Sequence, residues 1–134
     1  MGLYDQFKTD NTLEQQGVWF EISDGVKFLI ARAGGSNKKY RRSLDQRSKP
    51  YRAQLRNNTI DAEKLRELSM LAFVDACLLD WYGVTDAADE PLVFNRGNVL
   101  KVFAELPDVY DTLFEAASSS GSYRDAEVAE AGEL

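Results

Sequence analysis

Residues 81–114 read WYGVTDAADEPLVFNRGNVLKVFAELPDVYDTLF. An aromatic pair followed by Gly83 is typical of a helix end, because glycine readily adopts the left-handed conformation that terminates a helix. The apolar segment 91–94 leads to Asn95, whose side chain can cap the helix that follows. Pro107 suits the first turn of another helix. The stretch therefore predicts the end of one helix, an extended bridge and two further helices.

Apolar residues recur at steps of three and four in the segment before this stretch. They form one helical stripe: Leu68, Leu71, Val74, Leu78 and Trp81. This spacing is typical of a helix with one buried face. It predicts a long central helix that begins at Thr59 or Asp61 and ends at Tyr82.

Residues 18–22 and 26–30 are largely apolar and flank Ser23-Asp24-Gly25, which predicts a β-hairpin. A three-residue loop with Gly25 in the left-handed conformation keeps the apolar face intact. It pairs Val18 with Ile30, Phe20 with Phe28, Glu21 with Lys27 and Ile22 with Val26. A two-residue loop would place Lys27 opposite Ile22 and mix charge into that face. We therefore expect the three-residue loop.

Gly34-Gly35 ends the hairpin unit and joins it to a helix. Ser36 or Asn37 can cap this helix, which runs toward Ser48. Pro50 breaks or kinks it, because proline lacks the amide hydrogen that a helix interior uses.

These patterns together predict a mainly α-helical fold: a small helical domain with an N-terminal β-hairpin and a disordered acidic C-terminal tail. The expected organisation is a flexible arm at 1–17, a single globular domain at 18–117 (hairpin 18–31, helices 37–117) and a tail at 118–134. At 134 residues the chain can bury one core without disulfides. The predicted core residues are Phe20, Phe28, Leu71, Val74, Leu78, Trp81, Phe94, Phe103, Leu106 and Phe114.

The net charge of −6 conceals an uneven distribution. Residues 1–60 hold 11 Lys and Arg against 6 Asp and Glu, whereas residues 61–134 hold 5 against 16. Such a chain can attract copies of itself head to tail or dock onto a complementary partner. The candidate partner-binding residues are Lys38, Lys39, Arg41, Arg42, Arg47 and Arg52. An acidic partner, the acidic half of the protein itself, nucleic acid and a merely solvated helix all remain open, although the low overall pI disfavours nucleic acid.

The chain contains no histidine, which removes the commonest general base and transition-metal ligand. Cys77 lies among apolar residues and has no evident partner for thiolate chemistry. We therefore expect no catalytic residues, no bound metal and no cofactor, and a protein that is not an enzyme. No segment has the length and hydrophobicity of a membrane span or the pattern of a secretion signal, so we expect no membrane partner and a location in the cytoplasm.

The order of motifs between residues 81 and 108 resembles that of the tail assembly chaperones of long, flexible-tailed bacteriophages. The matching positions are Trp81 with Gly83, Pro91 to Phe94 with Asn95, and Leu106 to Asp108, and weaker similarity extends over roughly residues 17 to 124. At Asp86 to Glu90 the chain has Asp-Ala-Ala-Asp-Glu where many members have a glycine, which leaves the conformation of this loop open.

The resemblance implies a function in tail assembly. Members of that family coat the long tape measure protein, keep it soluble, help recruit tail tube subunits and leave before the virion is mature. They also make a longer form by programmed ribosomal frameshifting, and the extra segment binds the tail tube protein. This chain is similar to the short form, and we expect it to act in the host cell cytoplasm and to self-associate into a spiral or helical oligomer. The alternative is a nucleic-acid-binding or regulatory module that uses the basic segment 38–56.

Overall fold

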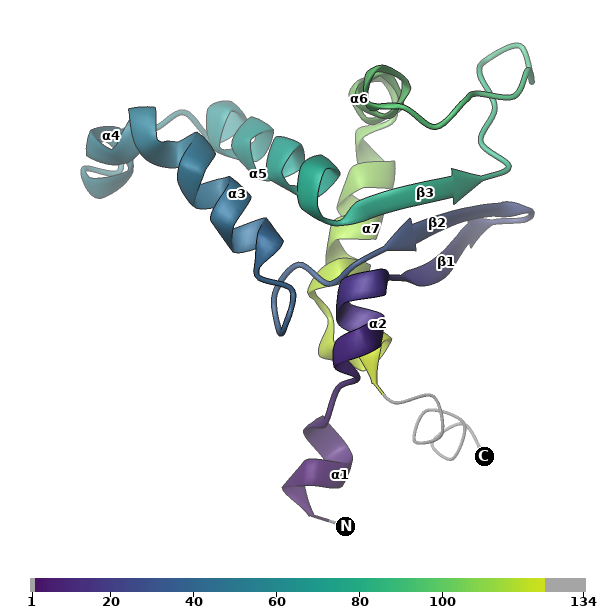
Figure 1. The fold of residues 1–134 in the computed structure, drawn as a ribbon. Helices are drawn as coiled ribbons and strands as arrows, with labels where there is room; N and C mark the ends of the chain where they lie inside the picture. The colour runs from purple at the N-terminus through teal and green to yellow at the C-terminus, as the bar shows by residue number, and fades with distance from the viewer. Residues whose placement is uncertain (1, 125–134) are drawn as a thin grey trace.

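The computed structural model describes residues 2–124 (Figure 1). The helices are α1 (Leu3–Phe7), α2 (Asn11–Gln16), α3 (Lys39–Ser48), α4 (Arg52–Arg56), α5 (Ala62–Ala76), α6 (Arg96–Glu105) and α7 (Pro107–Ser118), and short 3₁₀ helices cover Lys49–Tyr51 and Ser120–Tyr123. The strands are β1 (Val18–Ser23), β2 (Val26–Ile30) and β3 (Leu78–Tyr82). Helices therefore dominate the described chain and accompany a small antiparallel sheet.

The predicted N-terminal hairpin is confirmed, and most of its register is as expected. Val18 pairs with Ile30, Phe20 with Phe28, and Glu21 with Lys27. Gly25 adopts a positive φ of 76°, as expected for the loop. The expected three-residue loop and its pair of Ile22 with Val26 are wrong: Ser23 faces Val26 across the two-residue turn Asp24-Gly25, and Ile22 is the extra residue of a β-bulge. The bulge lets a shorter turn close the hairpin while the apolar face stays continuous.

The predicted long helix is wrong at its C-terminal end. α5 begins after its cap Asp61, one of the two expected starts, but it ends at Ala76, and residues 78–82 form β3 instead. β3 pairs with β2, and a register shift makes Leu79 an extra residue, so that Leu78 and Trp81 both point into the core. A three-residue step between buried positions is the spacing of a helix, and here a bulged strand produces it.

Gly83 ends a strand rather than a helix. Glycine is required at this position because the backbone of Gly25 lies close to it. Its φ is 77°, and a Cβ atom at this position would lie 2.0 Å from the carbonyl oxygen of Gly25. The turn of the hairpin therefore fits directly against the end of β3.

Aromatic side chains join the helices to the inner face of the sheet. Phe73 of α5 is fully buried and packs against the rings of Tyr110 and Phe114, at centroid distances of 5.6 and 6.0 Å. Trp81 packs edge-on against Phe28 at 6.0 Å and Phe94 at 5.4 Å. The core is thus a continuous aromatic layer between β1–β3 and α5–α7.

The predicted core residues are buried to different degrees. Phe28, Val74, Leu78, Trp81 and Phe103 are buried, and Phe20, Leu71, Phe94 and Phe114 are partly buried. Leu106 is 56% exposed, and its assignment to the core is wrong. It lies at the junction of α6 and α7, outside the regular turns that direct the neighbouring apolar residues inward. The caps of this region are as predicted, with Asn95 accepting from the amide of Asn98 at 2.8 Å and Pro107 in the first turn of α7.

α2 and the last described residues pack against the core, contrary to the expected tail and to the later part of the expected arm, whereas α1 is exposed. α2 lies against the C-terminal 3₁₀ helix, and the amide of Asp10 donates to the carbonyl of Tyr123 at 2.8 Å. Tyr123 is fully buried, and its hydroxyl donates to the carbonyl of Ile30 at 3.0 Å. Disorder from Ser118 is therefore wrong as far as Arg124, because a single aromatic residue anchors this segment. Residues 125–134 of the expected tail lie outside the described residues.

Replacing Tyr123 tests this anchor. Tyr123→Ala should lower the free energy of unfolding by about 3–5 kcal/mol, the usual cost of truncating a buried aromatic residue. Tyr123→Phe removes only the hydrogen bond to Ile30 and should cost about 1 kcal/mol. Urea unfolding followed by circular dichroism measures both, with the largely exposed Tyr4→Ala as the control, expected within about 0.5 kcal/mol of the wild type. A Tyr123→Ala protein as stable as the wild type would contradict the packing of this segment.

Candidate partner-binding surface

A helical hairpin protrudes from one side of the sheet and core (Figure 1). It consists of α3, the 3₁₀ turn at Lys49–Tyr51, α4 and α5, and we refer to residues 39–76 as the helical hairpin. α3 packs along α5, and the ring of Tyr40 lies 5.9 Å from that of Phe114 at the base. Near the tip, Lys64 lies over the ring of Tyr51 at 5.4 Å. The two helices therefore support each other beyond the core.

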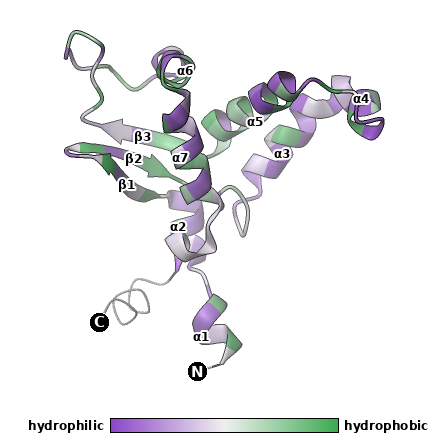
Figure 2. Ribbon diagram, turned by 180° about the vertical axis from the view of Figure 1, so that it is seen from behind, coloured by the Kyte–Doolittle hydropathy of each residue, from purple (hydrophilic) through white to green (hydrophobic). Residues whose placement is uncertain are grey.

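α3 presents a polar face to solvent, and Figure 2 shows it mostly in hydrophilic and neutral colours. Tyr40, Leu44 and Arg47 face α5 and are partly buried, whereas Arg41 and Arg42 are exposed. This three- to four-residue alternation is that of a helix with one packed side.

The predicted partner-binding residues separate into three groups. Lys38, Lys39, Arg41 and Arg42 are exposed and lie together at the start of α3. Arg52 is exposed as well, but it begins α4 at the far end of the helical hairpin. Arg47 is bound within the protein, because it forms an ion pair with Asp75 of α5.

Asp75 holds two arginines from different elements. Besides Arg47 of α3, it pairs with Arg96 at the start of α6. Its carboxylate therefore connects the helical hairpin to α6 on the surface of the core. Arg47 contributes to this connection and not to the free basic surface, which sequence reasoning could not foresee because the acid and the bases are far apart in the chain.

An apolar groove runs along one side of the helical hairpin. Its cavity volume is about 420 Å³, and its walls come from α3, α4 and α5 together with the Gly34 loop. Tyr40, Leu44, Leu55 and Leu65 line it, and Arg41 and Asp45 stand at its border. Leu65 is 42% exposed although it is a large aliphatic residue. We call these six residues the hairpin groove.

Sequence reasoning missed the hairpin groove. Leu44 and Leu55 are isolated apolar residues in very polar segments, and Leu65 precedes the stripe that marks the buried face of α5. The available signal was the four-residue spacing of Tyr40 and Leu44. The helix break at Pro50, which folds α4 back, decides that these residues meet.

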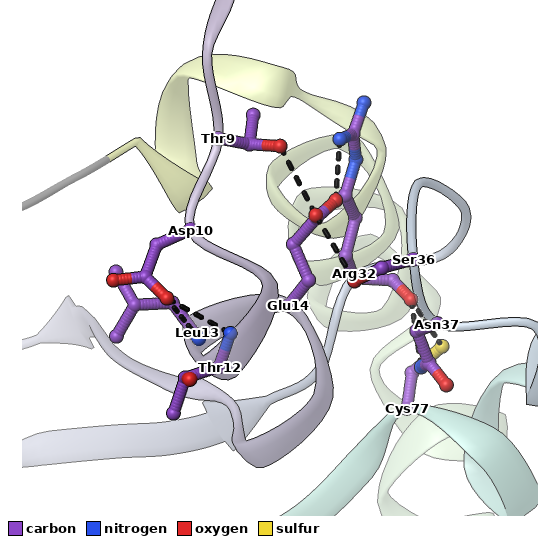
Figure 3. A network of polar contacts seen from close by, with 9 residues as sticks. All are labelled: Thr9, Asp10, Thr12, Leu13, Glu14, Arg32, Ser36, Asn37 and Cys77. Carbon is purple, nitrogen blue, oxygen red and sulfur yellow. Dashed lines mark hydrogen bonds and ion pairs between the residues drawn. The ribbon is translucent and has the colours of Figure 1, made fainter.

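A buried carboxylate fixes the base of the helical hairpin (Figure 3). The side chain of Glu14 is 1% exposed and accepts hydrogen bonds from Thr9 at 3.0 Å and Ser36 at 3.1 Å. Arg32 completes the set with an ion pair of 2.5 Å. One side chain of α2 thus joins the end of β2 to the loop that begins the helical hairpin.

Two neighbouring residues complete this junction. A Cβ atom at Gly35 would lie 1.8 Å from the Glu14 carboxylate, so glycine leaves the space in which the carboxylate fits. Asn37 is buried, and its amide donates to the carbonyl of Arg32 at 2.9 Å. The Gly34-Gly35 pair is therefore the expected joint between strand and helix.

The thiol of Cys77 lies beside this junction (Figure 3). Burial raises the pKa of this thiol to about 12, which keeps it protonated.

Within residues 2–124, no three His, Cys, Asp or Glu side chains gather where they could hold a metal ion. None of the helices in this part of the chain is long and apolar enough to cross a membrane. A recess of about 450 Å³ lies between the 84–92 segment and α6, lined by residues that include Val84, Leu92 and Leu106.

The Glu14 network predicts a pH-dependent contribution to stability. Burial alone raises the pKa of Glu14, but the hydrogen bonds from Arg32, Thr9 and Ser36 and the charge of Arg32 outweigh it, so the pKa is lowered overall. A lowered pKa in the folded state stabilises the fold above the unfolded-state pKa of about 4.3. This contribution is lost as the pH falls through the folded-state pKa.

Glu14→Gln should therefore lower the free energy of unfolding by roughly 2–3 kcal/mol near pH 7, because Arg32 loses its ionic partner. The difference from the wild type should narrow below about pH 4.3. Chemical unfolding between pH 3 and 8 measures it, with Glu115→Gln on the exposed side of α7 as the matched control. A difference that stays constant over this range would rule out the charge of Glu14 as the cause.

Comparison with known proteins identifies a family to which this chain is similar. No curated protein and no solved structure matches the chain significantly. A family model described as YdaY prophage protein matches residues 35–133, which include the helical hairpin, β3, α6 and α7. The match covers more than half of the chain. The chain belongs to the YdaY prophage protein family and is thus of phage origin.

Proposed function

We propose that this phage protein is a tail assembly chaperone in its short form, which binds the tape measure protein and keeps it soluble. The observation that carries the proposal is the hairpin groove, which lies on the protruding pair of helices. The resemblance of residues 81–108 to tail assembly chaperones and the phage family of the chain both support it.

The shape of the hairpin groove suits a helical partner. Amphipathic helices commonly bind by laying an apolar face into a groove between helices of another protein. Tyr40, Leu44 and Leu65 offer aliphatic and aromatic contacts along α3 and α5, which is what an exposed apolar stripe on a long helix needs. Covering such stripes prevents a long helical protein from aggregating before the tail tube forms around it.

The charges beside the hairpin groove favour a partner with acidic positions flanking its apolar stripe. Lys38, Lys39, Arg41 and Arg42 are exposed at the start of α3. The ion pair from Arg41 to Asp45, at 3.5 Å between two exposed side chains, is weak and leaves Arg41 accessible. These basic residues would orient the partner and speed its association more than they would add affinity.

The residues that carry the resemblance have structural roles. Trp81 is buried, and its indole donates to the carbonyl of Leu92 at 3.0 Å while its ring packs against Phe94. This contact fastens the 84–95 segment to the sheet. The resemblance therefore supports a shared fold, and the hairpin groove supports the binding role.

In this role the protein has no catalytic activity, works in the host cell cytoplasm and is absent from the mature virion. A longer form made by frameshifting recruits the tail tube protein.

Co-expression with the tape measure protein of the same phage tests the proposal. The wild-type chain should keep the tape measure protein in the soluble fraction and co-purify with it. Leu65→Glu places a charge in the hairpin groove at a helix position that accepts glutamate well, and it should reduce co-purification about tenfold or more. Val93→Glu is the matched control, since Val93 is largely exposed and lies in the bridge segment outside the groove.

Two outcomes would contradict the proposal. One is a tape measure protein that stays insoluble with the wild-type chain, and the other is equal co-purification with Leu65→Glu and the wild type. Circular dichroism and thermal unfolding must show that both variants fold.

A nucleic-acid-binding or regulatory module is the second candidate, favoured by the exposed cluster Lys38, Lys39, Arg41 and Arg42. Binding to phosphates would weaken steeply with salt, because each contact releases a counterion. Gel shifts with duplex DNA and with RNA at increasing salt distinguish the candidates. A shift that is lost on Lys38→Glu with Arg42→Glu would favour this module over the chaperone.

A further inference from the structure

Aromatic residues are exposed on the outer face of the sheet. The inner-face residues of β1–β3 are packed against the helices, whereas Trp19 of β1 and Tyr82 of β3 are 46% and 67% exposed. Together with Lys27 of β2 they line an open recess of about 430 Å³. Leu79, the extra residue of the β3 bulge, is exposed as well. Aromatic residues grouped in this way on a small protein are typical of an interaction surface.

The N-terminal arm, residues 2–8, is a second uncovered apolar feature. Its helix α1 has five residues, and the side chains of Leu3, Tyr4 and Phe7 are between 62% and 86% exposed. A helix this short is not stable by itself in water and needs packing from another element. Figure 1 shows α1 projecting from the body, and Figure 2 shows hydrophobic segments on it.

The base of the N-terminal arm is fixed, which holds α1 away from the core. Thr9 forms a β-bridge with Arg124, and the Asp10 side chain caps α2 by accepting from the amide of Thr12 at 2.8 Å. Glu14 then anchors α2 itself. Because α2 and its cap are fixed, α1 is presented outward as an apolar projection.

We propose that α1 of one copy packs on the outer sheet face of a second copy. Tyr4 and Phe7 would contact the ring faces of Trp19 and Tyr82, which favours offset or edge-on aromatic pairs. This contact goes beyond the proposed chaperone function and does not depend on it, since both surfaces belong to the same chain.

Charge complementarity supports a second copy as the occupant. The N-terminal arm carries Asp5 and Lys8, and the sheet face carries Lys27 with Glu21 and Asp80. Within residues 2–124, none of these five groups forms an ion pair. Each charge of the arm therefore has a charge of opposite sign available on the face, Lys27 for Asp5 and Glu21 or Asp80 for Lys8. These charges lie next to the apolar groups of both surfaces.

The proposed contact joins two different surfaces. Such a heterologous contact adds copies in a row, as an open helix or a closed ring according to the rotation between neighbours. The two surfaces are small compared with a standard interface, so the association should be weak and dependent on concentration. It also differs from charge pairing through α3, because its main contacts are apolar.

Sedimentation velocity of the full chain over a range of concentrations tests the proposal. The mean mass of the wild type should rise with concentration. An arm variant, Tyr4→Asp with Phe7→Asp, and a face variant, Trp19→Thr with Tyr82→Glu, should each stay monomeric to at least tenfold higher concentration. Arg41→Glu with Arg42→Glu is the control and should assemble like the wild type.

Mixing the two variants gives the decisive result. The arm variant keeps an intact sheet face and the face variant keeps an intact arm, so an equimolar mixture should form one contact and stop at a dimer. A mixture that stays monomeric, with both variants folded by circular dichroism, would overturn the pairing of these surfaces. A wild type that is monomeric at every concentration, or assembly lost only in the control, would overturn the proposal as well.

Discussion

The pairing of β3 with β2 is the contact on which the arrangement of the whole chain depends. It places Trp81 against Phe28 and so brings a segment that follows α5 back onto the N-terminal hairpin. Without this third strand the hairpin would be a two-stranded ribbon of marginal stability. With it, the sheet gains an inner face broad enough to pack on the aromatic residues of α5, α6 and α7. The bulge at Leu79 is part of this solution, because it keeps Leu78 and Trp81 on the buried side.

Two polar junctions then fix the helical hairpin relative to this core. Glu14 binds the loop before α3 from one side, and Asp75 binds Arg47 and Arg96 on another. The first junction is buried and the second is partly exposed, so the first should contribute more to stability. The ends of α3 and α5 are thereby held, while their outer halves extend beyond the aromatic core. A protruding and yet supported pair of helices is well suited to present the hairpin groove.

The two proposed binding surfaces lie on different elements of the protein. The hairpin groove lies on α3, α4 and α5, whereas the self-contact uses α1 and the outer face of β1–β3. A copy could therefore hold a helical partner and a neighbouring copy at the same time. Successive copies along a long partner would each make weak contacts with the partner and with a neighbouring copy. Because these contacts are linked, the overall affinity would be high.

Much of the local structure could be predicted from the sequence, because its causes are local. The hairpin turn at Gly25, the cap at Asp61, the cap at Asn95 and the helix start at Pro107 each depend on the residue itself and its neighbours. The phage character of the chain is likewise supported by sequence, through the family match.

The tertiary structure decided every feature that depends on contacts between residues far apart in the sequence. The spacing of Leu78 and Trp81 fits a helix as well as a bulged strand, and only the presence of β2 beside it selects the strand. Arg47 belongs to the basic pattern in the sequence, but Asp75 removes it from the free surface. Tyr123 lies in a polar segment of the sequence but is a core residue, because its hydroxyl donates to the carbonyl of Ile30 and its ring packs against that of Phe20. Periodicity shows which residues share one face of an element. Which other element of the chain packs on that face is decided only when the chain folds.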